Sequence, residues 1–191
     1  MNSTFSDNSL MNKVKEGDLD KLGLLFERYK RMLFSYFYGM NKDAELSEDL
    51  VQNTFMRVLK YRKAFKGDGQ FKHWIFHIAR NVNFDHYKKN KMKFSVDIDN
   101  YRDSLSEGAT AESDMVEQED RDRLQKALQM LDPDKREVIV LSKIEGMKYA
   151  EIGALMEISE GTVKVRVFRA MQDLKQLLNP ESQNYYLKKI K

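Results

Sequence analysis

Apolar residues recur at steps of three and four along several segments of this chain, and this period restricts those segments to α-helix. In the stretch FKHWIFHIARNVNFDHYKK, residues 71–89, the stripe consists of Phe71, Trp74, Ile75, Ile78 and Val82. Residues 18–40 and 47–61 repeat the period. Only two prolines and nine glycines occur among 191 residues, which favours long helices over a turn-rich sheet architecture. The sequence therefore predicts an all-α fold.

Charge is distributed unevenly along the chain. The net charge is +3, but ten acids against two bases between Asp97 and Asp122 give that segment −8 and leave +11 for the rest. Two basic halves joined by an acidic segment suggest a polyanionic partner such as nucleic acid. A solvated lysine-rich surface is the alternative.

The chain divides into two helical domains around this acidic segment. We expect an N-terminal helical bundle at 18–92, an acidic flexible linker at 93–121, a C-terminal helix-turn-helix domain at 122–180 and a fraying tail at 181–191. Residues 1–17 are expected to form a loose start. Within the first domain, residues 62–70 are predicted to form a loop, because Gly67 and Gly69 flank Asp68.

The second face of the helix at 71–89 mixes aromatic and cationic residues. Aromatic rings stack on unpaired bases for about 1–3 kcal/mol each, and cations attract phosphates. Packing of this helix on two sides explains the aromatics equally well, so both interpretations stay open for each ring. The residues are Phe76, Phe84 and Tyr87 with His73, His77, Arg80 and Lys88.

The second half carries the signature of a helix-turn-helix. Asp132 is a predicted cap, Pro133 suits the first helical position, and Gly146 ends that helix. A short helix at 149–156, a tight turn and a longer helix capped by Ser159 follow. Glu157 occupies a turn position where glycine is favoured, because Glu tolerates a left-handed backbone poorly.

The last helix presents a polar face suited to a DNA major groove. Lysine and arginine reach guanine acceptors or phosphates, and threonine reaches either. An ordinary pair of helices with a basic, solvated face is the alternative. The residues off the buried stripe are Thr162, Lys164, Arg166 and Arg169.

A third polar face lies on the helix at 47–61. Asp49, Gln52, Asn53 and Arg57 flank its apolar stripe. This face suits docking on another protein's helices and suits solvent equally well.

Catalytic motifs and cofactor-binding motifs are missing from the sequence. There is no cysteine, no glycine-rich phosphate loop and no serine-nucleophile motif. His73 and His77 are four residues apart but lack further ligands nearby, so a solvent-facing pair is expected in place of a metal site. No apolar run approaches the roughly 20 residues of a membrane span, and the first ten residues carry no signal pattern. We expect a non-enzymatic cytoplasmic protein without a metal or cofactor.

Two long motifs resemble a known family. SEDLVQNTFMRVLK (47–60) followed by residues 71–89 is similar to the core of the extracytoplasmic-function (ECF) sigma factors of bacterial RNA polymerase. Residues 131–178 resemble their promoter-reading domain. The similarity covers about residues 22–91 and 124–178, in the family's order.

The resemblance implies a role for each polar face. Partners implied are core RNA polymerase, through the clamp helices of its largest subunit and its flap region, promoter DNA, and an anti-sigma factor of the kind many relatives have. The implied polymerase-binding residues are Asp49, Gln52, Asn53 and Arg57; those for the minus-ten element are Phe65, Lys66, Gly67, Asp68, Gln70, Arg80 and Asn81; those for the minus-thirty-five element are Ser159, Thr162, Lys164, Arg166 and Arg169.

Four positions depart from the family's pattern. Asn53 replaces a frequent Glu, and Lys148 stands where Ser or Thr commonly caps the first helix of the helix-turn-helix. Gly153 and Glu157 replace the usual Ala and Gly of its turn.

The expected function is transcription initiation: the chain binds core polymerase, directs it to two-part promoters and aids strand opening without catalysing a reaction. The alternatives are an autonomous helix-turn-helix regulator that binds duplex operators, and a protein-interaction module with merely solubilising basic halves.

Overall fold

The computed structural model describes residues 5–94 and 112–179, and over these residues it contains helices and no strand. Its elements are α1 (Asp7–Glu16), α2 (Asp20–Asn41), α3 (Ala44–Lys60), the 3-10 turn η1 (Arg62–Ala64), α4 (Phe71–Phe94), α5 (Glu112–Gln129), α6 (Pro133–Ile139), the π-helical turn η2 (Val140–Ile144), α7 (Tyr149–Met156) and α8 (Glu160–Leu178). The all-α prediction is confirmed.

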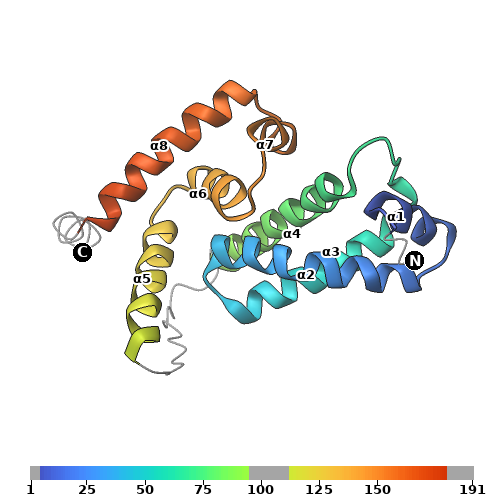
Figure 1. Cartoon of the computed structure of the whole chain (residues 1–191), viewed down its shortest axis with the longest axis horizontal. Helices are drawn as coiled ribbons and strands as arrows, with labels where there is room; N and C mark the ends of the chain where they lie inside the picture. Colours follow the sequence, from blue (N-terminus) through green and yellow to red (C-terminus); the bar gives the residue numbers. More distant parts are fainter. Residues whose placement is uncertain (1–4, 95–111, 180–191) are drawn as a thin grey trace.

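The N-terminal half is a bundle of α2, α3 and α4 with α1 at one end (Figure 1). The predicted stripe of α4 is confirmed, since Phe71, Ile75, Ile78 and Val82 are buried and Trp74 packs half-buried against the same core. α3 begins at Ala44, earlier than expected, because the Asp43 side chain caps it by accepting a hydrogen bond from the Leu46 N–H at 2.9 Å.

The expectation of a loose start is wrong from Asp7 onward. Ser6 caps α1 through a bond from the Ser9 N–H, and Gly17 ends it with a left-handed φ of 114°. Leu10, Met11 and Val14 are fully buried. Burial of this apolar face against the bundle explains why so short a helix is stable.

The expected extended linker is also partly wrong. α4 continues to Phe94, and α5 begins at Glu112, so the C-terminal end of the predicted linker is helical. The remainder of that linker and the predicted tail lie outside the described residues.

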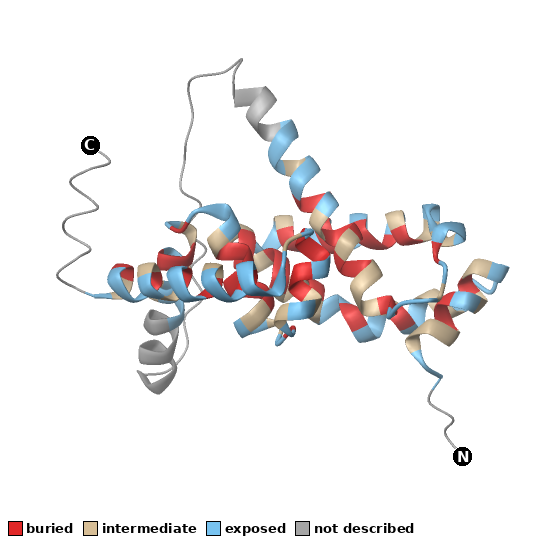
Figure 2. Ribbon diagram, turned by 90° about the horizontal axis from the view of Figure 1, so that it is seen from above, coloured by how far each residue is buried: buried red, intermediate tan, exposed pale blue. Residues whose placement is uncertain are grey.

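The two halves share one hydrophobic core. α2 contacts α5, α6 and η2, while α4 contacts α7. Buried residues occur in both halves and where they meet (Figure 2). Gly39 on α2 permits the close approach, because a Cβ there would lie 2.9 Å from a methyl of Val140.

Candidate nucleic-acid interface

The turn between α7 and α8 is tight and depends on two unusual residues. Glu157 adopts the left-handed conformation with φ 59° and ψ 39°. Gly153 lies so close to the turn that an added Cβ would be 2.7 Å from the Ile158 carbonyl oxygen. The glycine is therefore required on α7, although the left-handed position itself carries a Glu.

Both helices of the helix-turn-helix are capped at their N-terminal ends. The Ser159 hydroxyl accepts a hydrogen bond from the Thr162 N–H at 3.1 Å, which confirms the predicted cap. At the start of α7, Lys148 replaces the usual Ser or Thr, and the Glu151 carboxylate instead accepts from the Lys148 N–H at 2.8 Å. That bond, with a smaller effect from His73, keeps the pKa of Glu151 below its usual value.

α8 presents three of its predicted DNA-binding residues to solvent. Thr162, Lys164 and Arg169 are exposed, while Arg166 is turned toward α6, where it pairs with Asp134 at 3.0 Å. Val165 and Phe168 were not among the predicted DNA-binding residues, yet they are 49% and 63% exposed. The sequence could have indicated their exposure, because both are apolar residues that lie off the buried stripe of this helix.

The loop between η1 and α4 exposes polar residues around a buried anchor. Phe65 is only 2% exposed, and its ring packs edge-on against Trp74 at 5.3 Å between centroids. Lys66, Asp68 and Gln70 are exposed, and Gly67 has a left-handed φ of 79°. In the free chain the side chain of Phe65 thus fixes the loop and faces away from any strand bound outside.

The mixed face of α4 separates into buried and exposed aromatics. Phe76 is core, packed edge-on against Tyr36 at 5.6 Å. Phe84 and Tyr87 are 65% and 43% exposed. They line a groove of about 390 Å³ together with Arg80 and Asn81. A flat ring and an exposed amide in one groove suit an unpaired base.

Arg80 is engaged across the two halves. Its guanidinium lies 3.1 Å from the Glu137 carboxylate of α6, a side chain only 8% exposed. Asn81 next to it is exposed.

Of the three histidines of α4, His73 and His77 are half-buried, and the expected solvent-facing pair is wrong at His73, which contacts α7. His73 lies 3.2 Å from Glu151 of α7. Within residues 5–94 and 112–179, no group of three or more His, Cys, Asp or Glu side chains could hold a metal ion.

α3 carries the predicted protein-docking face. Asp49, Gln52 and Asn53 are exposed, and Arg57 pairs with Asp85 of α4 at 2.7 Å. Gln52 also borders a groove of about 480 Å³ between α2 and α3, whose apolar lining comes from Phe26, Phe34 and Val51.

Across the described part of the chain, no helix is both long and apolar enough to cross a bilayer.

Known proteins match both halves. Residues 25–92 match the family model described as sigma-70 region 2, and residues 121–174 match the one described as sigma-70, region 4. Among relatives, the RNA polymerase sigma factor CarQ of Myxococcus xanthus is 34% identical over 168 residues, which cover 88% of this chain and 95% of CarQ. The ECF RNA polymerase sigma factor SigW of Bacillus subtilis is 29% identical over 177 residues, covering 88% and 94%.

A solved structure supports the same assignment. The sigma factor RpoE of Bartonella quintana, crystallised with the anti-sigma factor NepR, superposes with a TM-score of 0.65 at 26% identity, covering 82% of this chain and 95% of RpoE. The fold and its exposed faces thus define a two-domain promoter-recognition protein of the sigma-70 type. The chain belongs to the ECF sigma factors, which direct RNA polymerase to promoters.

Proposed function

We propose that each exposed face performs one step of initiation. The α3 face (Asp49, Gln52, Asn53, Arg57) docks on the clamp helices of the largest polymerase subunit, and the C-terminal domain meets the flap region. The loop Phe65–Gln70 and the Arg80–Asn81 side of α4 hold the unpaired minus-ten strand. α8 enters the major groove at the minus-thirty-five element. The chain acts in the cytoplasm and catalyses no reaction.

The observation that carries this proposal is the separation of two chemically different nucleic-acid faces. α8 exposes Lys164 and Arg169 behind a capped N-terminus, which suits duplex edges and phosphates. α4 exposes Phe84 and Tyr87 beside Asn81, which suits unstacked bases. A duplex operator alone would have no use for the second face.

Each face alone offers a small footprint, so the free chain binds promoter DNA weakly. Holding both domains on polymerase makes the second contact intramolecular and raises overall affinity by roughly 10²–10⁴. Strand opening then follows from capture of extruded bases.

The test is reconstitution with core polymerase on promoters selected from a random DNA library. Run-off transcription should require both the chain and core enzyme. Lys164→Ala should weaken binding at the minus-thirty-five element and reduce the salt slope by about one. Lys175→Ala, exposed near the other end of the same helix, is the matched control and should change neither.

Two outcomes would contradict the proposal. Tight binding to duplex DNA without core enzyme would favour an autonomous regulator. A failure to direct transcription from any selected promoter would favour a protein-interaction module.

An anti-sigma factor is the further partner that the comparison supports. RpoE of Bartonella quintana was crystallised with such a protein. We place the site on this chain at the apolar groove between α2 and α3, because it adjoins the proposed polymerase-docking face. A partner bound there should displace core polymerase from a fluorescently labelled chain, and simultaneous binding of both would contradict this placement.

A further inference from the structure

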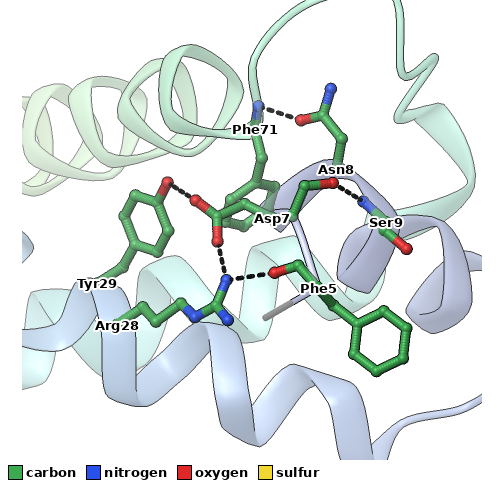
Figure 3. Close-up of polar contacts among 8 residues, drawn as sticks. Phe5, Asp7, Asn8, Ser9, Arg28, Tyr29 and Phe71 are labelled. Carbon is green, nitrogen blue, oxygen red and sulfur yellow. Dashed lines mark hydrogen bonds and ion pairs between the residues drawn. The ribbon is translucent and has the colours of Figure 1, made fainter. Parts of the chain in front are cut away.

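One side chain of α1 bonds to the backbone on both sides of Gln70, where the loop enters α4. The Asn8 amide Nδ2 donates to the Gly69 carbonyl at 2.7 Å, and its Oδ1 accepts from the Phe71 N–H at 2.8 Å; Figure 3 shows the bond to Phe71. The first N–H groups of a helix have no partner within it. Asn8 therefore caps α4 from a different helix and at the same time fixes the residue before it.

The same face of α1 contacts the loop at two more points. Lys15 donates through Nζ to the Phe65 carbonyl at 2.8 Å. Asn12 lies beside Gly67, where an added Cβ would be 3.5 Å from its Oδ1. Positions 8, 12 and 15 share one face of a helix, so α1 follows the loop from its first residue to its last.

α1 is itself held rigidly on α2. The Asp7 carboxylate accepts from the Tyr29 hydroxyl at 2.6 Å and from Arg28 Nη1 at 2.5 Å (Figure 3). Arg28 also donates to the Phe5 carbonyl at 2.9 Å. Burial, reinforced by the bond to Asp7, raises the pKa of Tyr29 above its usual value, which keeps the hydroxyl a donor. α1 therefore connects the loop to the core of the bundle.

We propose that Asn8 is a positioning residue, which holds the loop Phe65–Gln70 in the conformation that takes up an unpaired minus-ten base without touching DNA itself. This inference rests on the loop's proposed role in strand capture. Asparagine supplies the donor and the acceptor that this position needs, whereas aspartate supplies only acceptors and alanine supplies neither. Without Asn8 the loop samples other conformations, and binding is weakened by the fraction of competent loops that is lost.

The experiment compares two DNA probes with the full chain bound to core polymerase. One is a fork-junction probe with an unpaired non-template minus-ten strand, and the other is a duplex probe carrying only the minus-thirty-five element. Asn8→Ala should weaken fork-junction binding on the order of tenfold, equivalent to one or two net hydrogen bonds. Duplex binding should change less than twofold.

Two further variants separate positioning from general damage to α1. Asn8→Asp keeps the acceptor for Phe71 and loses the donor for Gly69, so it should show a smaller loss on the fork-junction probe. Lys13→Ala is the matched control on the same helix, because the Lys13 ammonium lies 4.0 Å from the centroid of the Phe5 ring, outside the loop. This variant should bind both probes like the wild type. Hydrogen exchange at the Phe71 amide should accelerate in Asn8→Ala and stay slow in Lys13→Ala.

The outcomes distinguish a failure of the role of Asn8 from a failure of the loop's proposed role in strand capture. Equal losses on both probes, or full fork-junction affinity in Asn8→Ala, would overturn the role of Asn8 alone. A second comparison uses wild-type holoenzyme and two probes, one with an unpaired and one with a paired minus-ten strand. Equal affinity for these two probes would overturn the loop's proposed role as well.

Discussion

The Tyr36 hydroxyl donates a hydrogen bond to the Glu137 carboxylate, 2.9 Å away and 101 positions later in the chain. Tyr36 is fully buried on α2, and burial together with the charge of Glu137 raises the pKa of its hydroxyl. Arg80 of α4 pairs with the same carboxylate. Arg136, next to Glu137, donates to the Met40 carbonyl at 2.6 Å. Adjacent charged residues of α6 therefore bind the N-terminal bundle.

Removing the Tyr36 hydroxyl should weaken the contact between α6 and the N-terminal bundle. In Tyr36→Phe the buried carboxylate loses one of its donors, which should lower the free energy of unfolding by about 1–3 kcal/mol. Urea unfolding measures this. Tyr38→Phe is the control, because that half-buried tyrosine packs through its ring on Phe34; an equal loss in both variants would contradict the specific role of Tyr36.

A bulky residue at position 39 should separate the two halves. Gly39→Leu forces side-chain volume into a space where a Cβ alone would lie 2.9 Å from Val140. We expect a larger radius of gyration by small-angle X-ray scattering. Gly23→Leu, on the same helix with nothing within 4 Å of its Cβ, should leave the radius unchanged, and a similar value for both variants would argue against a steric contact at Gly39.

Glu145 should make stability depend on pH. Its Oε1 is buried. Burial raises its pKa to about 7, opposed by a hydrogen bond with Ser35 and the charge of Lys72. Since the folded-state pKa lies above the unfolded value, the folded state holds the proton more tightly. The stabilisation that Glu145 gains from binding its proton more tightly in the folded state is complete below about pH 4.5, and it is lost as the pH rises through 7.

The variant Glu145→Gln removes this titration. It should be more stable than the wild type at pH 8, and the difference should narrow toward pH 5. Thermal unfolding at four pH values checks this, and a constant difference across the range would refute it.

Gly153→Ala should distort the helix-turn-helix. The new Cβ would lie 2.7 Å from the Ile158 carbonyl oxygen and 3.4 Å from the Glu160 nitrogen, both backbone atoms that yield little. We expect a loss of about 1–3 kcal/mol in stability, measured by chemical unfolding. Gly161→Ala on α8, where an added Cβ would meet only the Ser159 hydroxyl at 3.9 Å, should be neutral or stabilising.

Glu157→Gly should act in the opposite direction. Glycine adopts φ near 59° without the strain of a Cβ, and a non-glycine residue there costs about 1–2 kcal/mol. The greater freedom of glycine in the unfolded chain offsets part of the gain. A melting temperature below that of the wild type would contradict this balance.

Local signals predicted much of the fold. The caps at Asp132 and Ser159 and the stripe of α4 depend on nearby residues, and the structure contains all three. α1 escaped prediction because its stability comes from burial of its apolar face against the bundle and from bonds to α2 and the loop, which no local pattern reveals. The helical start of α5 was hidden by an acidic composition typical of linkers.

The candidate site shows the same division. The exposure of Lys164 and Arg169 follows from the helical period of α8. The burial of Phe76 against Tyr36 and the pairing of Arg166 with Asp134 depend on elements distant in sequence. The burial of Phe65 depends on the ring of Trp74 in the following helix. Spacing within one helix cannot show which of its two faces meets another element.

The pairing of Arg80 with Glu137 has a consequence for the chain before it meets polymerase. A carboxylate in this position neutralises the guanidinium as a phosphate oxygen would. The unbound protein therefore presents one cation fewer to the genome. Because non-specific affinity for DNA grows with every phosphate contact, this internal pairing should weaken binding of the free factor to bulk chromosomal DNA.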